Sequence, residues 1–83
     1  MINIVATGIN KADKTKLEIS ICISHPYWTI QGEEAACDVK ISPLYENILP
    51  ISGVDLFQAL KLAIELSNSL IIAISDKYDL TYH

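Results

Sequence analysis

The side chains best suited to chemistry in this sequence are two cysteines and two histidines, Cys22, His25, Cys37 and His83. Thiolates and imidazoles are the ligands that zinc prefers, and structural zinc sites usually supply them as two closely spaced pairs. Cys22 and His25 form one such pair, but Cys37 and His83 lie far apart in the chain. We therefore expect no metal site and no cofactor.

An enzyme would need a nucleophile beside its base, or two acids in one cleft. His25 could activate the Cys22 thiol, but the two residues are close simply because both lie near the end of one expected strand. Glu33 and Glu34 fall in a polar turn that favours solvated carboxylates. The glycine-rich phosphate-binding motifs are absent, and three glycines are too few for a phosphate cradle. The sequence predicts a protein that is not an enzyme.

The best candidate for binding a partner is the short stretch His25-Pro-Tyr27-Trp28. Tyrosine and tryptophan are enriched among the residues that dominate protein interfaces. The alternative is that Trp28, the only tryptophan, closes an edge of the core. Ile72 joins His25, Tyr27 and Trp28 as a candidate contact, because its helical position falls among polar side chains and leaves it exposed.

Composition excludes some classes of partner. The 83 residues carry a net charge of −4, and all six basic residues are lysines. Because phosphate and guanine recognition relies on a basic face and on arginine, we expect no nucleic-acid binding. The N-terminus lacks the pattern of a signal peptide, and no run approaches transmembrane length, so we expect a cytoplasmic protein with free thiols that binds no membrane. An acidic protein of this size suits a basic protein partner.

The main element that positions these residues is one long helix, predicted over about residues 53–75. Ser52 is the expected N-cap, and Asp55 three residues later completes a capping box. An alternative ends the helix near Ser67 and leaves residues 70–75 as a β-strand, because short apolar runs fit either structure.

The apolar sector of this helix spans roughly 220°, against about 100° for an ordinary surface helix. Either the 43–51 loop and the C-terminal tail cover its flanks, or a second subunit or another partner does. Ser67 lies inside the apolar sector, and its hydroxyl is expected to donate to the Ala63 carbonyl.

The sheet is predicted from three strands, at about residues 2–8, 16–24 and 35–42, with the tail 76–83 either adding a short edge segment or fraying. Alternation places one set of side chains against the helix: Ile2, Ile4, Ala6, Leu17, Ile19, Ile21, Ile23, Ala35, Cys37, Val39 and Ile41. Cys22 faces the other side, so no disulfide with Cys37 is expected. The predicted fold is a single α+β domain, residues 1–83, in which an antiparallel three-stranded meander packs on one long C-terminal helix in two layers.

The second half of the chain resembles a family of small bacterial domains of unknown function. The residues that carry the resemblance are Cys37-Asp-Val-Lys-Ile and Gly53-Val-Asp-Leu-Phe-Gln-Ala-Leu-Lys-Leu-Ala63, followed by Leu70. The family pattern is approximately G-x-D-x-x-Q-A-L-x-L-A on the last helix, after a strand that bears tryptophan and cysteine, which Trp28 and Cys37 would match. The resemblance implies a bacterial origin and a β-rich fold with a C-terminal helix. It implies no activity.

Together these observations favour a non-enzymatic, protein-binding module, with a stoichiometric inhibitor of a toxin or nuclease (an immunity-type protein) as its most specific form. The alternative is a homo-oligomeric structural or accessory protein, in which the helix face or an open strand edge pairs with itself. An enzyme or metal protein that uses Cys22, His25 or the two glutamates is the third hypothesis.

Overall fold

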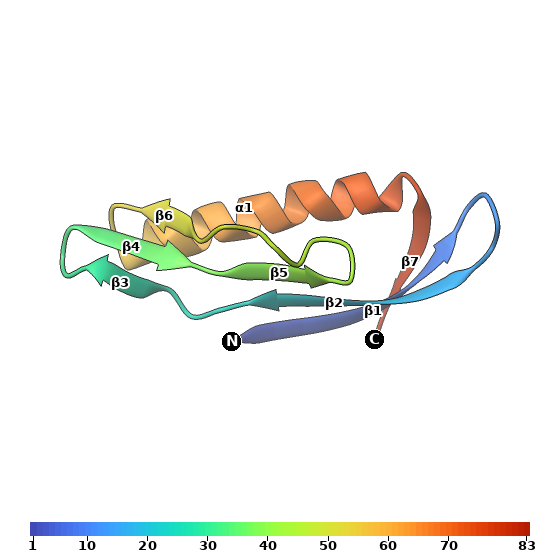
Figure 1. Cartoon of the computed structure of the whole chain (residues 1–83), viewed down its shortest axis with the longest axis horizontal. Coiled ribbons are helices and arrows are strands. Elements are labelled where there is room, and N and C mark those ends of the chain that lie inside the picture. Colours follow the sequence, from blue (N-terminus) through green and yellow to red (C-terminus); the bar gives the residue numbers. More distant parts are fainter.

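A computed structural model describes all 83 residues (Figure 1). The elements in chain order are β1 (Ile2–Asn10), β2 (Lys16–Ile23), β3 (Tyr27–Ile30), β4 (Glu34–Cys37), β5 (Val39–Ser42), β6 (Ile51–Gly53), α1 (Leu56–Ser75) and β7 (Tyr78–Tyr82).

The strands form two antiparallel sheets, so the prediction of a single three-stranded meander is wrong. One sheet has the order β5-β2-β1-β7 and the other has the order β3-β4-β6. The predicted strand at 16–24 corresponds to β2, whereas the predicted strand at 35–42 is divided into β4 and β5. β6 comes from residues assigned to the connecting loop and the helix start, and β7 comes from the tail.

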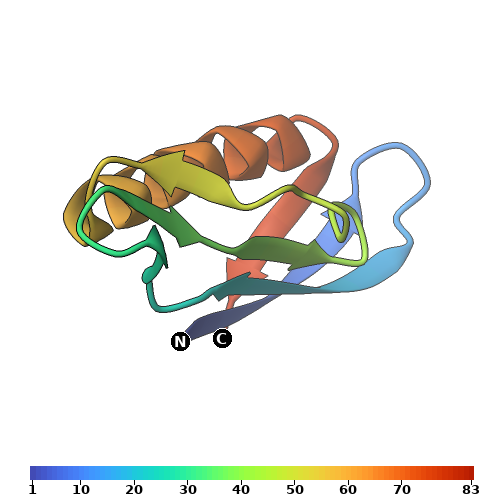
Figure 2. The same cartoon turned by 60° about the vertical axis from the view of Figure 1, so that its left-hand side comes forward.

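The breaks between β2 and β3 and between β4 and β5 have a local cause. Pro26 has no N–H to donate to a ladder, so β2 ends at Ile23 and β3 begins at Tyr27. Opposite this gap, Asp38 separates β4 from β5. The Ser24 N–H donates to the Asp38 carbonyl at 2.9 Å, and the Asp38 N–H donates to Ser24 Oγ at 2.9 Å. These bonds keep the two sheets joined as one long, twisted ribbon (Figure 2).

Ten buried side chains join both sheets to the helix: Ile19, Ile21, Ile23, Ala35, Cys37, Val39, Ile41, Ala59, Ala63 and Ile74. The inward faces predicted for 16–24 and 35–42 are therefore confirmed from Ile19 onward. Ala36 was expected to face outward, yet it is also buried. It lies between Tyr27 of β3 and Ser52 of β6 in the middle of a sheet, where neighbouring side chains cover a methyl group easily.

The first half of β1 is less covered than predicted. Ile2, Ile4 and Ala6 were expected to face the helix, but Ile2 and Ile4 remain 48% and 41% exposed while Ala6 is buried. β7 pairs with β1 only from Ala6 to Asn10. Beyond that point β1 has a single neighbouring strand, β2, and its inner face is open.

The helix begins after Asp55, not after Ser52 as predicted. Ser52 and Gly53 pair with β4, which holds their backbone extended. The Asp55 carboxylate accepts the Gln58 N–H at 2.7 Å, and Gln58 Oε1 accepts the Val54 N–H at 2.7 Å. The N-cap therefore lies three residues later in the chain than expected, and Gln58 binds the N–H of the residue before the N-cap, where a standard capping box would bind the N–H of the N-cap itself.

The helix continues to Ser75, so residues 70–75 are helical and the alternative strand is excluded. The Ser67 hydroxyl donates to the Ala63 carbonyl at 2.8 Å, as predicted. Only Ala59, Ala63, Ser67 and Ile74 of the helix are buried. The contact with the sheet thus runs mainly along small side chains, which lets the helix approach closely but covers little of its apolar surface.

Most of this apolar helix is left uncovered by the fold. Its 20 residues have a mean hydropathy of 1.4, so by length and composition alone α1 could cross a membrane, contrary to the expectation that no run approaches that length. Core helices of folded domains can be equally long and apolar, but here only 22% of the apolar segment is buried. The shape adds to this exposure, since the radius of gyration is 14.2 Å, against about 12 Å for a compact domain of this length.

Candidate functional site

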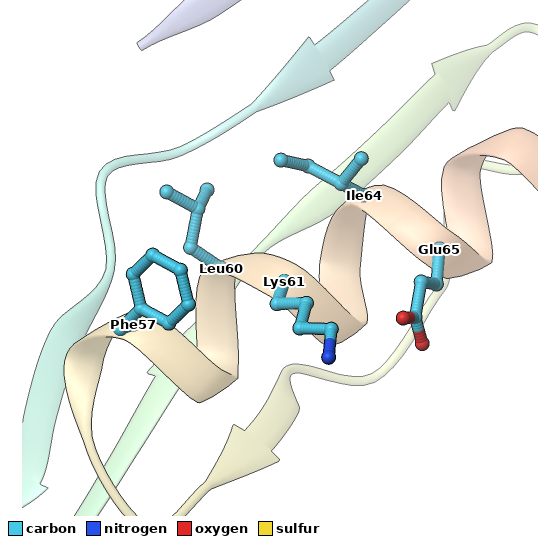
Figure 3. A pocket seen from close by; sticks show the side chains of 5 residues that line it. All are labelled: Phe57, Leu60, Lys61, Ile64 and Glu65. Carbon is cyan, nitrogen blue, oxygen red and sulfur yellow. The ribbon is translucent and has the colours of Figure 1, made fainter.

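The most prominent surface feature is an apolar groove along one flank of α1. Phe57, Leu60 and Ile64 leave the helix on the same side, while Lys61 and Glu65 leave from the neighbouring side (Figure 3). These five residues line a hollow of about 200 Å³. We call this hollow, together with the one that continues it towards β1, the apolar groove.

The second hollow has a volume of about 510 Å³ and shares Ile64 with the first. Its lining comes from β1, β2, α1 and β7: Ile4, Ile21, Ile23, Ile64, Ser67, Asn68, Ile71 and Tyr82. Helical spacing explains the continuity, because Phe57, Leu60, Ile64 and Ile71 recur at intervals of three, four and seven residues and so share one flank. The groove therefore runs along most of the helix.

The apolar side chains of the groove are strongly exposed for their size. Phe57 is 78% exposed, Ile64 47% and Tyr82 54%. Burying an aromatic or branched aliphatic side chain is worth about 1.5–3 kcal/mol. Exposed apolar surface that is continuous along an element marks interaction sites in folded proteins. The groove is thus the candidate contact surface of this protein.

The charge along the groove is balanced, although the whole chain is acidic. Lys61 and Glu65 are the only charged residues among those that line it. A separate hollow, lined by Glu33, Glu34, Ser52, Gly53, Val54 and Gln58, lies where the β3–β4 turn meets the start of α1, and it holds two carboxylates without a lysine. The groove and the acidic hollow therefore differ in the charge that they present.

Beside the groove, β1 has an open edge without the usual protection. Because the His83 N–H donates to the Val5 carbonyl at 3.0 Å, alternation along the strand aims the N–H and carbonyl of Asn3 at the same open side. No charged residue occurs from Ile2 to Asn10. Natural sheets normally protect such an edge with charge, proline, a bulge or a short strand.

The other strand edges all carry that protection. β5 contains Lys40 and is followed by Pro43, and the exposed side of β7 carries Asp79. β3 has a register shift between Trp28 and Ile30 and follows a proline. β6 is three residues long. The edge of β1 next to the groove is the exception, which supports its use in a contact.

The residues predicted to bind a partner occupy four different settings. The Tyr27 hydroxyl donates to Asp38 Oδ1 at 2.9 Å, and this bond, with smaller contributions from burial and the Asp38 charge, raises the pKa of Tyr27. Trp28 is half-buried against the core, in line with the alternative that it closes the core edge. His25 Nε2 lies 2.6 Å from the N-terminal ammonium. Ile72 lies on α1 and is 58% exposed. The fold does not bring these four residues together in the groove.

The cysteines and histidines are also dispersed. Cys37 is fully buried and donates to the Ser24 carbonyl at 3.2 Å, whereas Cys22 lies on the other side of the sheet near Asn3. His83 Nε2 lies 2.6 Å from Thr7 Oγ1. No three His, Cys, Asp or Glu side chains form a group that could hold a metal ion.

Burial makes the two thiols unequal. It raises the pKa of the Cys37 thiol from its ordinary value, an effect only partly offset by the hydrogen bond from Ser24. We expect a neutral, water-soluble disulfide reagent to modify Cys22 in the folded protein and to modify Cys37 at least about a hundredfold more slowly, because Cys37 reacts only after local opening. Thiol release followed in the Cys22→Ser and Cys37→Ser variants measures the two rates separately. Equal rates would contradict the burial of Cys37.

The raised pKa also gives the sign of a pH effect. When a thiol has a higher pKa in the folded state than in the unfolded state, its full contribution to stability is present at any pH below the unfolded-state pKa. That contribution is lost as the pH rises through the folded pKa, so it declines only at alkaline pH.

Sequence reasoning identified the wide apolar sector of the helix but did not single out Phe57, Leu60 and Ile64, which line the groove. The signal available was their spacing on one flank of the helix. What was missing was the knowledge that β7 and the 43–51 loop leave that flank open. No family model, curated protein or solved structure matches this chain.

Proposed function

We propose that the protein is a non-enzymatic, protein-binding module of the cytoplasm that holds its partner in the apolar groove. The observation that carries this proposal is the exposure of Phe57 and Ile64 on a helix of which only about a fifth is buried. A groove lined by adjoining aromatic and branched side chains matches the fully desolvated centre of a protein interface.

The way in which α1 packs supports a binding role. The helix approaches the sheet through Ala59, Ala63 and Ser67, and these side chains form a narrow stripe. A helix that served only the core would turn its leucines and isoleucines inward, because each buried one contributes about 1.5–3 kcal/mol. Here Ile74 is the only large helix side chain that is buried, and Phe57 and Ile64 remain available to another surface.

The test compares variants that differ only in where a charge is placed. Phe57→Asp and Ile64→Asp put a carboxylate into the groove, and we expect each to weaken partner binding by at least about tenfold. Leu49→Asp is the matched control, since Leu49 is 81% exposed and does not line the groove. Tagged proteins would be used to capture partners from the cells that express them, and calorimetry with the purified, identified partner would give the affinities.

Two results would overturn this proposal. One is a partner whose affinity is the same for the groove variants and for the wild type. The other is the absence of any bound protein, including further copies of the chain itself, at concentrations up to hundreds of micromolar. Circular dichroism of each variant separates a lost contact from a lost fold.

An inhibitor of a basic toxin or nuclease is the second candidate, and the acidic hollow favours it. Glu33 and Glu34 line that hollow beside Val54, which is 65% exposed. Carboxylates around an apolar side chain suit a basic partner and speed its association. In the same capture experiment, Glu33→Lys with Glu34→Lys should release a basic partner and leave a groove-bound partner in place.

A further inference from the structure

We infer that the partner seated in the apolar groove is a second copy of this chain, whose α1 packs antiparallel to the first about a two-fold axis near Ile64. The inference rests on the proposed binding function and names the partner. Self-complementarity is what a two-fold interface requires, because the same patch must fit itself.

Charge complementarity favours a second copy over a basic partner. Lys61 and Glu65 border the groove, and no other charge lines it. In a parallel pair each lysine would meet a lysine. In an antiparallel pair centred on Ile64, Lys61 lies on the same side as Glu65 of the second copy, offset by about 3 Å along the helix axis. Two long side chains can bridge that offset, so the charges at the groove of one copy complement those of the other although each chain has a net charge of −4.

The apolar side chains also match under this symmetry. About an axis at Ile64, residues equally distant from it along the chain come level with one another, so Phe57 lies opposite Ile71 of the second copy. Phe57 is exposed and Ile71 is partly covered at the edge of the core. An exposed aromatic ring on one helix therefore lies level with an apolar hollow of the other, and the arrangement occurs twice.

The open edge of β1 extends the same face. Ile4 lines the groove together with Ile64, and Ile2 lies beside it on the inner face of β1. With both helices above the sheets, the unprotected β1 edges approach each other across the axis. The absence of charge from Ile2 to Asn10 removes the like-charge repulsion that would otherwise arise when a strand meets its own copy.

The area available is sufficient for a modest dimer. A helix of 20 residues is about 30 Å long, and the molecule is 19 Å across, so the face measures roughly 600 Å² per copy. Two copies would bury about 1,200 Å², the lower bound for specific interfaces. We therefore expect a dissociation constant of about 1–100 µM.

The first measurement is the solution mass by sedimentation equilibrium from 1 to 500 µM. A monomer–dimer equilibrium within this range is the expected result. A strict monomer at 500 µM would overturn the second copy as the occupant of the groove. Assembly that continues beyond a dimer would overturn the closed two-fold arrangement.

Cysteine cross-linking then locates the axis. In a Cys22→Ser background, Ile64→Cys places a thiol next to its own copy, and oxidised glutathione should convert most of the protein to a disulfide-linked dimer. Leu49→Cys in the same background is the matched control, because Leu49 is 81% exposed and does not line the groove. We expect it to cross-link at least about tenfold more slowly. Equal rates would overturn this contact.

Charge reversal tests the antiparallel arrangement. Lys61→Glu or Glu65→Lys alone should weaken the dimer about five- to tenfold, and the double exchange should restore it to within about threefold. Failure of the double exchange to restore the dimer would overturn the antiparallel pairing. A failure of self-association leaves the capture experiment with Phe57→Asp and Ile64→Asp unaffected, so the two proposals fail separately.

Discussion

Replacing Gly53 by alanine should lower the free energy of unfolding by about 3 kcal/mol, the upper end of the range for overpacked sites. An added Cβ would lie 2.6 Å from the Ala59 backbone nitrogen and 3.0 Å from its Cα. Both atoms belong to the first turns of α1, so no side-chain rotation can relieve the clash. Either β6 must leave β4 or the helix must move away from the sheet. Urea unfolding followed by circular dichroism measures the change.

Gly32→Ala is the matched control for this substitution. Gly32 lies in the β3–β4 turn with φ of 73°, and an added Cβ would meet nothing within 4 Å. Only the backbone conformation opposes the alanine, at about 1 kcal/mol. If Gly53→Ala cost no more than Gly32→Ala, the close approach between β6 and α1 would not be a fixed part of the fold.

Ile41→Ala should destabilise the protein by about 2–5 kcal/mol, the range for removing a large aliphatic side chain from a core. Ile41 is fully buried and belongs to the cluster that joins both sheets to the helix. A domain of this length has a total stability of about 4–12 kcal/mol. The variant would thus lose a large share of its stability, which the urea midpoint reports if the slope is unchanged.

Ile72→Ala provides the same chemical change at a position that is 58% exposed. It should alter the stability by less than about 0.5 kcal/mol, because the isoleucine contributes little to the core and alanine is a better helix former. A loss at Ile72 as large as that at Ile41 would mean that the Ile72 side chain is covered in solution.

The sequence was sufficient to predict the regular parts of the fold. Strict alternation from Leu17 to Ile23 identified β2 and its buried face, and the apolar spacing after Asp55 identified α1 as far as Ser75. The secondary structure of these segments follows from the local sequence pattern alone. β6 was missed because three residues carry no periodicity, and Ser52 was taken for a helix cap because its pairing with β4 is a long-range contact that no local pattern shows.

The contact surface was only partly predictable for the same reason. The width of the apolar sector showed that the helix needed more cover than a small sheet gives. The courses of β6 before the helix and β7 after it determine which flank of the helix stays open. β7 turns to pair with the second half of β1, and this leaves Ile4 and Ile64 facing an empty groove. Aromatic composition pointed instead to Trp28, which is half-buried against the core.

The pairing of β7 with β1 has a consequence for how the chain folds. Ala6 lies opposite Tyr82, so the two ends of the sequence must meet before this ladder can form. The hairpin of β1 and β2 needs only local contacts and can form earlier. Until β7 arrives, the uncharged edge of β1 is open along its whole length. We therefore expect a chain in which β1 and β2 have paired but β7 has not to be prone to aggregation, and we expect conditions that delay the docking of β7 to lower the yield of refolding.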